Sequence, residues 1–209
     1  MVYHKQIFLV AMLACPLLPL ACNRCYAASA LEIYAAAESA DEEAGSEEEP
    51  QRNEPKETRG RSQSEVALRQ AARRIAAEYG IPPRLYEAVI EFESGFKSGR
   101  GSSGEYGLAQ VMPATGRMLE ESGQVKSSWR YDSLENLRAG AAHLRNLRVS
   151  ITRSEIEYAN RKQYNLWALL LAQYNGGKAG VGRSIRNDER LPYKLEWYIY
   201  NVLKRYNKL

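Results

Sequence analysis

LYEAVIEFESGFKSGRGSSGEYGLAQVMP, residues 85–113, joins an amphipathic helix to a glycine-rich loop. At about 100° per residue, a helix over residues 84–93 places Glu93 in the middle of an apolar arc. Glu87 and Glu91 fall on the opposite side, where we expect them to be solvated. A carboxylate on an apolar surface must find a partner, become neutral through a raised pKa, or serve a reaction. The apolar arc consists of Leu85, Tyr86, Ala88, Val89, Ile90 and Phe92.

The residues after Glu93 predict a helix end and then the wall of a cleft. Gly95 suits a left-handed C-terminal cap, and Phe96 is placed to fold back onto the last turn. Residues 99–104 are glycine-rich, and the chain becomes apolar again at Tyr106. A permissive loop beside a buried acid is typical of a cleft wall.

Residues 1–30 have the order of a secretory signal peptide: a basic start, an apolar run and the small residues Ala28-Ser29-Ala30. All 3 cysteines of the chain lie in this segment, so cleavage after Ala30 leaves no thiol for disulfides or metal binding. An uncleaved membrane anchor is one alternative. Lipidation at Cys22, which would make this residue a membrane tether, is another. Leu20-Ala21-Cys22 partly resembles a lipobox, but Pro19 stands where that pattern has Leu, so we do not favour it.

The sequence after the predicted signal divides into an acidic and a basic part. We expect residues 31–62 to be a disordered acidic linker, since residues 38–58 contain nine acids and almost nothing apolar. Residues 59–209 hold 25 Lys and Arg against 15 Asp and Glu, a net charge of +10, whereas the whole chain carries +4. This basic part attracts anionic polymers, unless its charges only keep helix faces soluble. We predict one folded domain, residues 63–209.

Hydrophobic periodicity predicts an all-α domain of about seven helices, because apolar residues recur at helical spacing and no two alternating runs flank a tight turn. Asp132 with Glu135 reads as a helix N-cap. Gly140, inside a helix, indicates a close helix contact. Leu134, Met112 and Met118 are expected to point inward. The expected helices cover residues 64–79, 84–93, 107–121 with a break or restart at Pro113, 132–147, 154–174, 180–186 and 192–206.

Several common chemistries find little support. The chain has 2 histidines, His4 and His143, without a metal-binding pairing, so we predict no metal and no cofactor. A Ser-His-acid triad would need His143, for which we favour a packing or surface role. The run Gly176-Gly177-Lys178 lacks the flanking residues of a phosphate loop and is better interpreted as a turn between helices.

A lone acid remains as the catalytic candidate. Glycoside cleavage ordinarily uses two carboxylates. Glu105 lies in the loop and Asp132 is assigned to a cap, so neither is a convincing second acid. If Glu93 acts alone, activation of water is hard to arrange, and a nucleophile supplied by the substrate becomes attractive.

Five motifs, in order, resemble the catalytic domain of the soluble lytic transglycosylase (SLT) family over about residues 75–206. The resemblance implies a lysozyme-like helical fold and cleavage of the bond between N-acetylmuramic acid and N-acetylglucosamine in peptidoglycan. It also implies that Glu93 protonates the glycosidic oxygen and then deprotonates the muramoyl 6-hydroxyl, which forms a 1,6-anhydro sugar without adding water. The motifs are ESGF (93–96), GLAQVMPAT (107–115), Asn136 with Gly140, AQYNGG (172–177), and Leu191-Pro192 with Tyr198-Ile199.

The resemblance assigns substrate contacts to residues on both sides of the cleft. Ser94 would hold the acid or the substrate, and Gln110 and the backbone near Met112 would contact sugar. The chain departs from the family pattern at Glu105 and Ala109, and also at Lys194-Leu195. These departures affect the cleft shape more than the acid.

The same resemblance assigns roles to three residues near the C-terminal end. Tyr174 and Asn175 match a Tyr-Asn pair beside the catalytic acid, and Tyr198 matches a late tyrosine that hydrogen-bonds the carboxylate. For the aromatic residues Trp197 and Tyr200 we favour core packing.

These features together predict an exported peptidoglycan lytic transglycosylase of the periplasm or cell envelope. Its expected partners are peptidoglycan glycan strands, with a cell-envelope secretion or conjugation apparatus as a further candidate and no nucleic acid. Two alternatives stay open. One is a lysozyme-type muramidase in which Glu105 or another acid guides water, and the other is a non-catalytic peptidoglycan-binding scaffold subunit.

Overall fold

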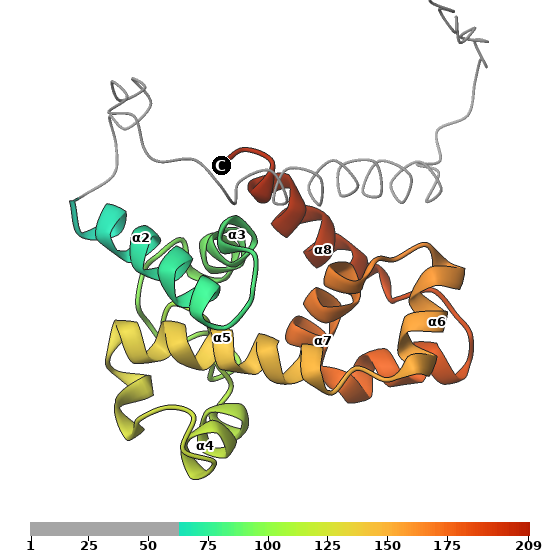
Figure 1. The fold of residues 1–209 in the computed structure, drawn as a ribbon, viewed down its shortest axis with the longest axis horizontal. Helices are drawn as coiled ribbons and strands as arrows, with labels where there is room; N and C mark the ends of the chain where they lie inside the picture. The colour runs from blue at the N-terminus through green and yellow to red at the C-terminus, as the bar shows by residue number, and fades with distance from the viewer. Residues whose placement is uncertain (1–62) are drawn as a thin grey trace, which may run out of the picture.

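The computed structural model describes residues 63–209, and the fold in this range is all-α, as predicted (Figure 1). The signal peptide predicted for residues 1–30, with Cys22, and the linker predicted for residues 31–62 lie outside the described residues. The helices are α2 (Gln63–Glu78), α3 (Pro83–Ser94), α4 (Pro113–Glu121), the 3-10 helix η2 (Ser127–Arg130), α5 (Ser133–Val149), α6 (Arg153–Lys162), α7 (Leu166–Arg186) and α8 (Tyr193–Tyr206).

Helix α5 is the element on which most of the others pack. It contacts α2, α4, η2 and α7, and Figure 1 shows it crossing the molecule below α2 and α3. Helix α3 lies between α2 and α8 and contacts both. The start of α5 follows the prediction, because the Asp132 carboxylate accepts a hydrogen bond of 2.8 Å from the Glu135 N–H.

The segment 107–112 differs from the predicted helix. Tyr106 and Val111 exchange two backbone hydrogen bonds of 3.0 Å and form a bridge that closes a tight turn. Within the turn Gly107 and Gln110 have positive φ angles of 73° and 46°, which an α-helix does not accept. Helix α4 therefore begins only at Pro113, where a proline is well tolerated.

The single helix predicted for residues 154–174 is two helices. Gln163, with φ of 61°, ends α6 in a left-handed conformation. The Asn165 side chain then caps α7 by accepting a hydrogen bond of 2.8 Å from the Ala168 N–H. The predicted interruption in the Gly176-Gly177 region is present, since Gly177 has φ of 70° and ψ of 156° within α7.

The prediction that Glu87 is solvated is wrong. Its side chain is 1% exposed and lies between two guanidinium groups of α2, with Arg69 Nη1 at 3.0 Å and Arg73 as a second partner. Arg69 also reaches the Glu91 carboxylate at 2.8 Å. The sequence periodicity of α3 shows which of its residues share a face, but not which other helix packs on that face. The partners come from α2, which covers that side and supplies the charge that a buried carboxylate needs.

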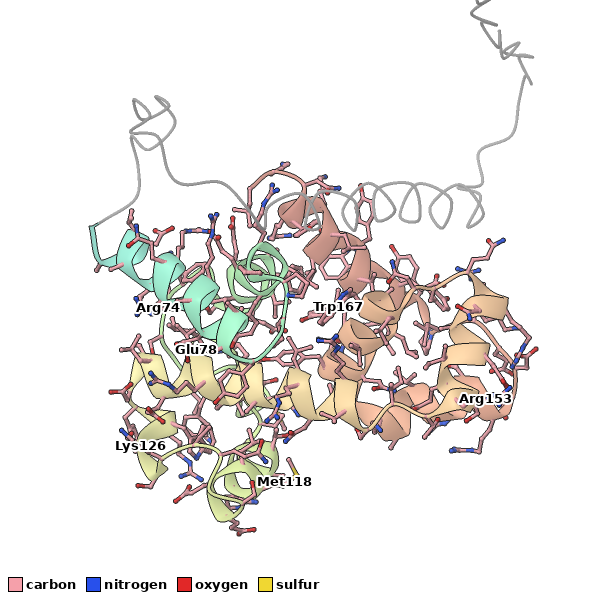
Figure 2. All side chains as sticks on the ribbon, viewed as in Figure 1. Arg74, Glu78, Met118, Lys126, Arg153 and Trp167 are labelled. Atoms are coloured by element: carbon pink, nitrogen blue, oxygen red, sulfur yellow. The ribbon has the colours of Figure 1, made fainter. Side chains whose placement is uncertain are left out.

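Three apolar residues predicted to point inward are exposed instead. Met112, Met118 and Leu134 are 45%, 48% and 41% exposed. Met112 precedes α4 and Leu134 is the second residue of α5, so both lie at helix starts. Figure 2 shows Met118 at the outer surface of α4. Within residues 63–209, no helix has the length and apolar character needed to span a membrane.

Gly140 marks the point where α5 comes closest to its neighbours, as predicted. A Cβ atom at this position would lie 2.5 Å from Ala109 Cβ, 2.5 Å from the Tyr86 hydroxyl and 3.1 Å from the Tyr174 hydroxyl. These atoms belong to the turn, to α3 and to α7. Any side chain larger than hydrogen would therefore push three elements apart.

We expect Gly140→Ala to lower the free energy of unfolding by about 1 to 3 kcal/mol, because overpacking outweighs the better helix propensity of alanine. The matched control is Gly180→Ala in α7, where nothing lies within 4 Å of an added Cβ, so alanine should be neutral or stabilising. Urea unfolding of both variants measures the difference. Equal stability of the Gly140 variant and the parent would contradict the close contact.

Candidate active site

Glu93 lies in the last turn of α3, where the end of the helix is fixed tightly. Gly95 has φ of 58° and ψ of 33°, the left-handed cap that the sequence predicts, and its N–H donates to the Glu91 carbonyl. Phe96 folds back and is 5% exposed, and the Arg69 guanidinium lies 4.3 Å from its ring centre. The helix end that carries Glu93 is therefore anchored to α2.

Tyr198 of α8 holds the Glu93 carboxyl group. Its hydroxyl donates a hydrogen bond of 2.6 Å to Glu93 Oε1, the contact that the resemblance implied. Tyr198 is 2% exposed, and its ring meets the Phe92 ring edge to face, at 5.0 Å and 88°. Residues 93 and 198 are brought together because α8 packs along α3.

The surroundings of Glu93 favour its neutral form. Burial raises the pKa of Glu93 to about 7, the hydrogen bond from Tyr198 lowers it, and the charge of Glu105 raises it. A carboxyl group with a pKa near neutrality can give up a proton and take one back at the same pH. This is the property required of one residue that serves as both acid and base.

Two further phenols, the buried Tyr86 and the partly buried Tyr174, lie close enough to Glu93 to feel its charge. Burial raises the pKa of Tyr86 and of Tyr174 well above the usual tyrosine value, and the Glu93 charge raises both further. The Tyr174 hydroxyl donates to the Ala109 carbonyl at 2.7 Å, and the Tyr86 hydroxyl donates to the Leu137 carbonyl at 2.5 Å. Both tyrosines are neutral donors. Tyr174 ties α7 to the turn, and Tyr86 ties α3 to α5.

Asn136 fixes the turn of residues 107–112, a role that sequence analysis did not assign to it. Its Oδ1 accepts from the Ala109 N–H at 2.8 Å, and its Nδ2 donates to the carbonyls of Tyr106 at 2.9 Å and Trp129 at 3.1 Å. The side chain is 1% exposed. The available signal was a polar residue one turn before Gly140, on the same helix face.

The structure places Gln110 in the turn, Ser94 and Met112 at helix ends, and Asn175 inside α7, two residues before the non-helical Gly177. Gln110 Nε2 donates to the Gly107 carbonyl at 2.7 Å, so this side chain supports the turn. The Ser94 hydroxyl donates to the Ile90 carbonyl at 3.2 Å and not to the Glu93 carboxylate. Met112 and Asn175 are exposed to solvent.

Two titratable residues near the site were named in the sequence analysis, Glu105 as a loop acid and His143 with a packing or surface role. Glu105 is half-buried and accepts a hydrogen bond of 3.0 Å from the Ser103 N–H. His143 lies on α5 with its ring centre 5.3 Å from that of Tyr174, and burial lowers its pKa to about 4, so it is neutral. Within the described part of the chain, no group of three or more His, Cys, Asp or Glu residues could hold a metal ion.

Comparison with known proteins identifies the family. A family model described as the transglycosylase SLT domain matches residues 70–196. The membrane-bound lytic murein transglycosylase C of Photorhabdus laumondii is 32% identical over 124 residues, which are 56% of this chain and 33% of that protein. The protein of the same name from Yersinia pestis (strain Pestoides F) is 31% identical over 123 residues, again 56% of this chain and 33% of its own. The chain spans about a third of the length of these curated relatives. The matched segment contains Glu93, the turn, Asn136 and Tyr174, and this chain belongs to the transglycosylase SLT domain family.

Proposed function

We propose that this protein is a lytic transglycosylase that cleaves the β-1,4 bond between N-acetylmuramic acid and N-acetylglucosamine in peptidoglycan, with Glu93 as the sole general acid and base. The observation that carries the proposal is a partly buried carboxyl group that accepts a hydrogen bond from a buried phenol, Tyr198, and has a pKa of about 7. Membership of the SLT family and the names of the curated relatives support the same reaction.

In the first step of the proposed reaction, protonated Glu93 gives its proton to the glycosidic oxygen. The bond from this oxygen to C1 of the muramoyl sugar breaks, the leaving sugar carries the proton away, and positive charge develops at C1. The Tyr198 hydroxyl, 2.6 Å from Oε1, stabilises the carboxylate that is left behind.

In the second step, the Glu93 carboxylate takes the proton of the muramoyl 6-hydroxyl. The oxygen of that hydroxyl forms a bond to C1 at the same time. The product is a 1,6-anhydro sugar, Glu93 is protonated again, and no water is consumed. Because the nucleophile belongs to the substrate, a second carboxylate that activates water is unnecessary. This agrees with a site where one acid is shielded and phenols surround it.

Hydrolysis is the second candidate reaction, since the charge of Glu105 is felt by Glu93. In that case Glu105 would guide a water molecule to C1, as the second carboxylate of a muramidase does. The Glu105 carboxylate is half-buried and is held by the backbone of Ser103, so it is partly engaged in ordering its own loop.

The proposed setting is the cell envelope, with glycan strands as the partner. The net charge of +10 over residues 59–209 favours an anionic polymer, and exposed basic side chains such as Arg74 on α2 and Arg153 on α6 lie on opposite sides of the domain (Figure 2). Export through the signal peptide, tethering at Cys22 and an association with secretion or conjugation machinery are parts of the same proposal.

Glu93→Gln should lower the release of soluble fragments from purified sacculi by at least about 100-fold, because glutamine keeps the shape but cannot transfer a proton. The matched control is Glu157→Gln, which changes an exposed carboxylate on α6 and should leave activity unchanged. Thermal unfolding shows whether both variants remain folded. Activity retained in the Glu93 variant would assign the chemistry to another residue, and an inactive parent that still binds sacculi would support the scaffold alternative.

Mass spectrometry of the released fragments distinguishes the two reactions. We expect muropeptides that end in 1,6-anhydromuramic acid, lighter by one water than the hydrolysis products. Glu105→Gln should leave this product unchanged and keep most of the activity. Reducing-end muramic acid in the parent digest, together with loss of activity in the Glu105 variant, would establish the muramidase reaction instead.

The pH dependence of kcat/KM should follow the Glu93 carboxyl group. Glu93 must be protonated in the free enzyme, so activity is full below its pKa of about 7 and falls as the pH rises through that value, by about tenfold per pH unit well above it. Tyr198→Phe removes the hydrogen bond that lowers this pKa, so the fall should move to higher pH while kcat decreases. The control Tyr158→Phe removes a phenol that donates to the Glu189 carbonyl, and should leave the profile in place. If the pH profile of the Tyr198 variant does not move, the ionisation that it reports belongs to a group other than Glu93.

A further inference from the structure

Helix α8 carries two large aromatic side chains on its solvent side. The prediction of core packing is wrong for Trp197, which contacts Phe92 but remains about half exposed. Tyr193 is 72% exposed and Trp197 is 48% exposed. The two residues are four positions apart, so they lie on one face of the helix, about 6 Å apart along its axis. Two neighbouring aromatic side chains in water form an apolar surface of the kind that marks a binding site.

The Phe92 ring connects this surface to the candidate active site. Its centre lies 5.7 Å from the Trp197 ring at 71°, and 5.0 Å from the ring of Tyr198, which holds the Glu93 carboxyl group. The Arg205 guanidinium lies 4.8 Å from the centre of the same Phe92 ring. Trp197 is therefore fixed one ring away from the tyrosine that holds the acid, at the end of α3 where the acid lies.

We propose that Trp197 and Tyr193 form a subsite that binds a further N-acetylhexosamine unit of the glycan strand on which Glu93 acts. The inference rests on the proposed function. Pyranose rings have apolar C–H faces that stack on the negative π faces of aromatic side chains. The rise of about 6 Å between the two positions along α8 is comparable with the length of one sugar unit.

Continuity with the site and the local charge favour a glycan strand as the occupant. A strand whose scissile bond lies at Glu93 must leave the site in both directions, and Trp197 packs against Phe92, the residue next to Glu93 in α3. Lys194, next to Tyr193, is exposed and can meet the carboxylates of peptide stems on the strand. A sugar could stack on Trp197 and Tyr193, and a carboxylate could pair with Lys194, without any rearrangement of the buried core, because all three side chains are exposed.

The test measures binding without turnover in the full chain carrying Glu93→Gln. Isothermal titration with β-1,4-linked N-acetylglucosamine dimer and hexamer separates the central site from the additional subsite. We expect Trp197→Ala in this background to weaken hexamer binding by about tenfold while dimer binding is unchanged. Tyr193→Ala, which removes a more exposed ring, should also weaken hexamer binding, by about threefold, and Trp197→Phe should restore most of the loss.

Tyr131→Ala is the matched control, since Tyr131 is an 83% exposed aromatic residue that follows η2, and it should bind both probes like the parent. Thermal unfolding verifies that each variant is folded. Unchanged hexamer binding in both the Trp197 and Tyr193 variants would overturn the subsite, as would an equal loss for dimer and hexamer. Binding to anionic phospholipid vesicles that depends on Trp197, with glycan binding unaffected, would overturn it in favour of a membrane surface.

The same variants separate failure of this inference from failure of the proposed function. If the parent releases anhydromuropeptides but Trp197→Ala binds hexamer normally, the reaction stands and the subsite is wrong. If the parent cleaves nothing but hexamer binding depends on Trp197, the sugar-binding surface stands and the reaction is wrong.

Discussion

The hydrogen bond from Tyr198 to a carboxyl group withdrawn from water is the interaction on which the candidate site depends. Helix α3 carries a fully buried carboxylate, Glu87, and a partly buried one, Glu93, and their surroundings differ. Glu87 lies between the guanidinium groups of Arg69 and Arg73, which compensate a buried charge directly. Glu93 has a phenol and the distant negative charge of Glu105, so the neutral form is favoured and its pKa rises to about 7. Two carboxylates of one helix therefore differ in role because their partners differ: Glu87 is structural, and Glu93 is suited to proton transfer.

The geometry of this site is set by contacts that converge on α5. The hydrogen of Gly140 leaves room for the hydroxyls of Tyr86 and Tyr174, which approach from α3 and α7. One turn earlier, Asn136 satisfies three backbone groups of the neighbouring turn and of η2. A buried amide with good partners at each polar atom stabilises and specifies a single arrangement. The turn of residues 107–112 is therefore tied into the packed core, although it contains no regular secondary structure.

Much of this arrangement could be predicted where the signal is local. The periodicity of residues 84–93 predicted the apolar side on which Glu93 lies, and glycine at position 95 predicted the end of the helix. Predictions failed where the cause was distant in sequence. Glu87 was placed in solvent because the arginines that pair with it belong to α2, and residues 107–112 were assigned to a helix because nothing local indicates the positive φ of Gln110. The Tyr198 contact came from motif resemblance, since the residues it joins are 105 positions apart.

The balance of effects at Glu93 explains why a single acid can serve both steps of the proposed reaction. Burial alone favours the neutral acid, which is a good proton donor but leaves an unstable carboxylate after the transfer. The Tyr198 hydroxyl stabilises that carboxylate and lowers the pKa, which offsets part of the burial effect. A residue held near the middle of these opposing effects loses little free energy in either protonation state, and a second carboxylate in contact with it would disturb this balance. The ring of Phe92 packs against Tyr198 and Trp197 together, so the same contacts that position the phenol also hold the exposed aromatic surface of α8 beside the acid.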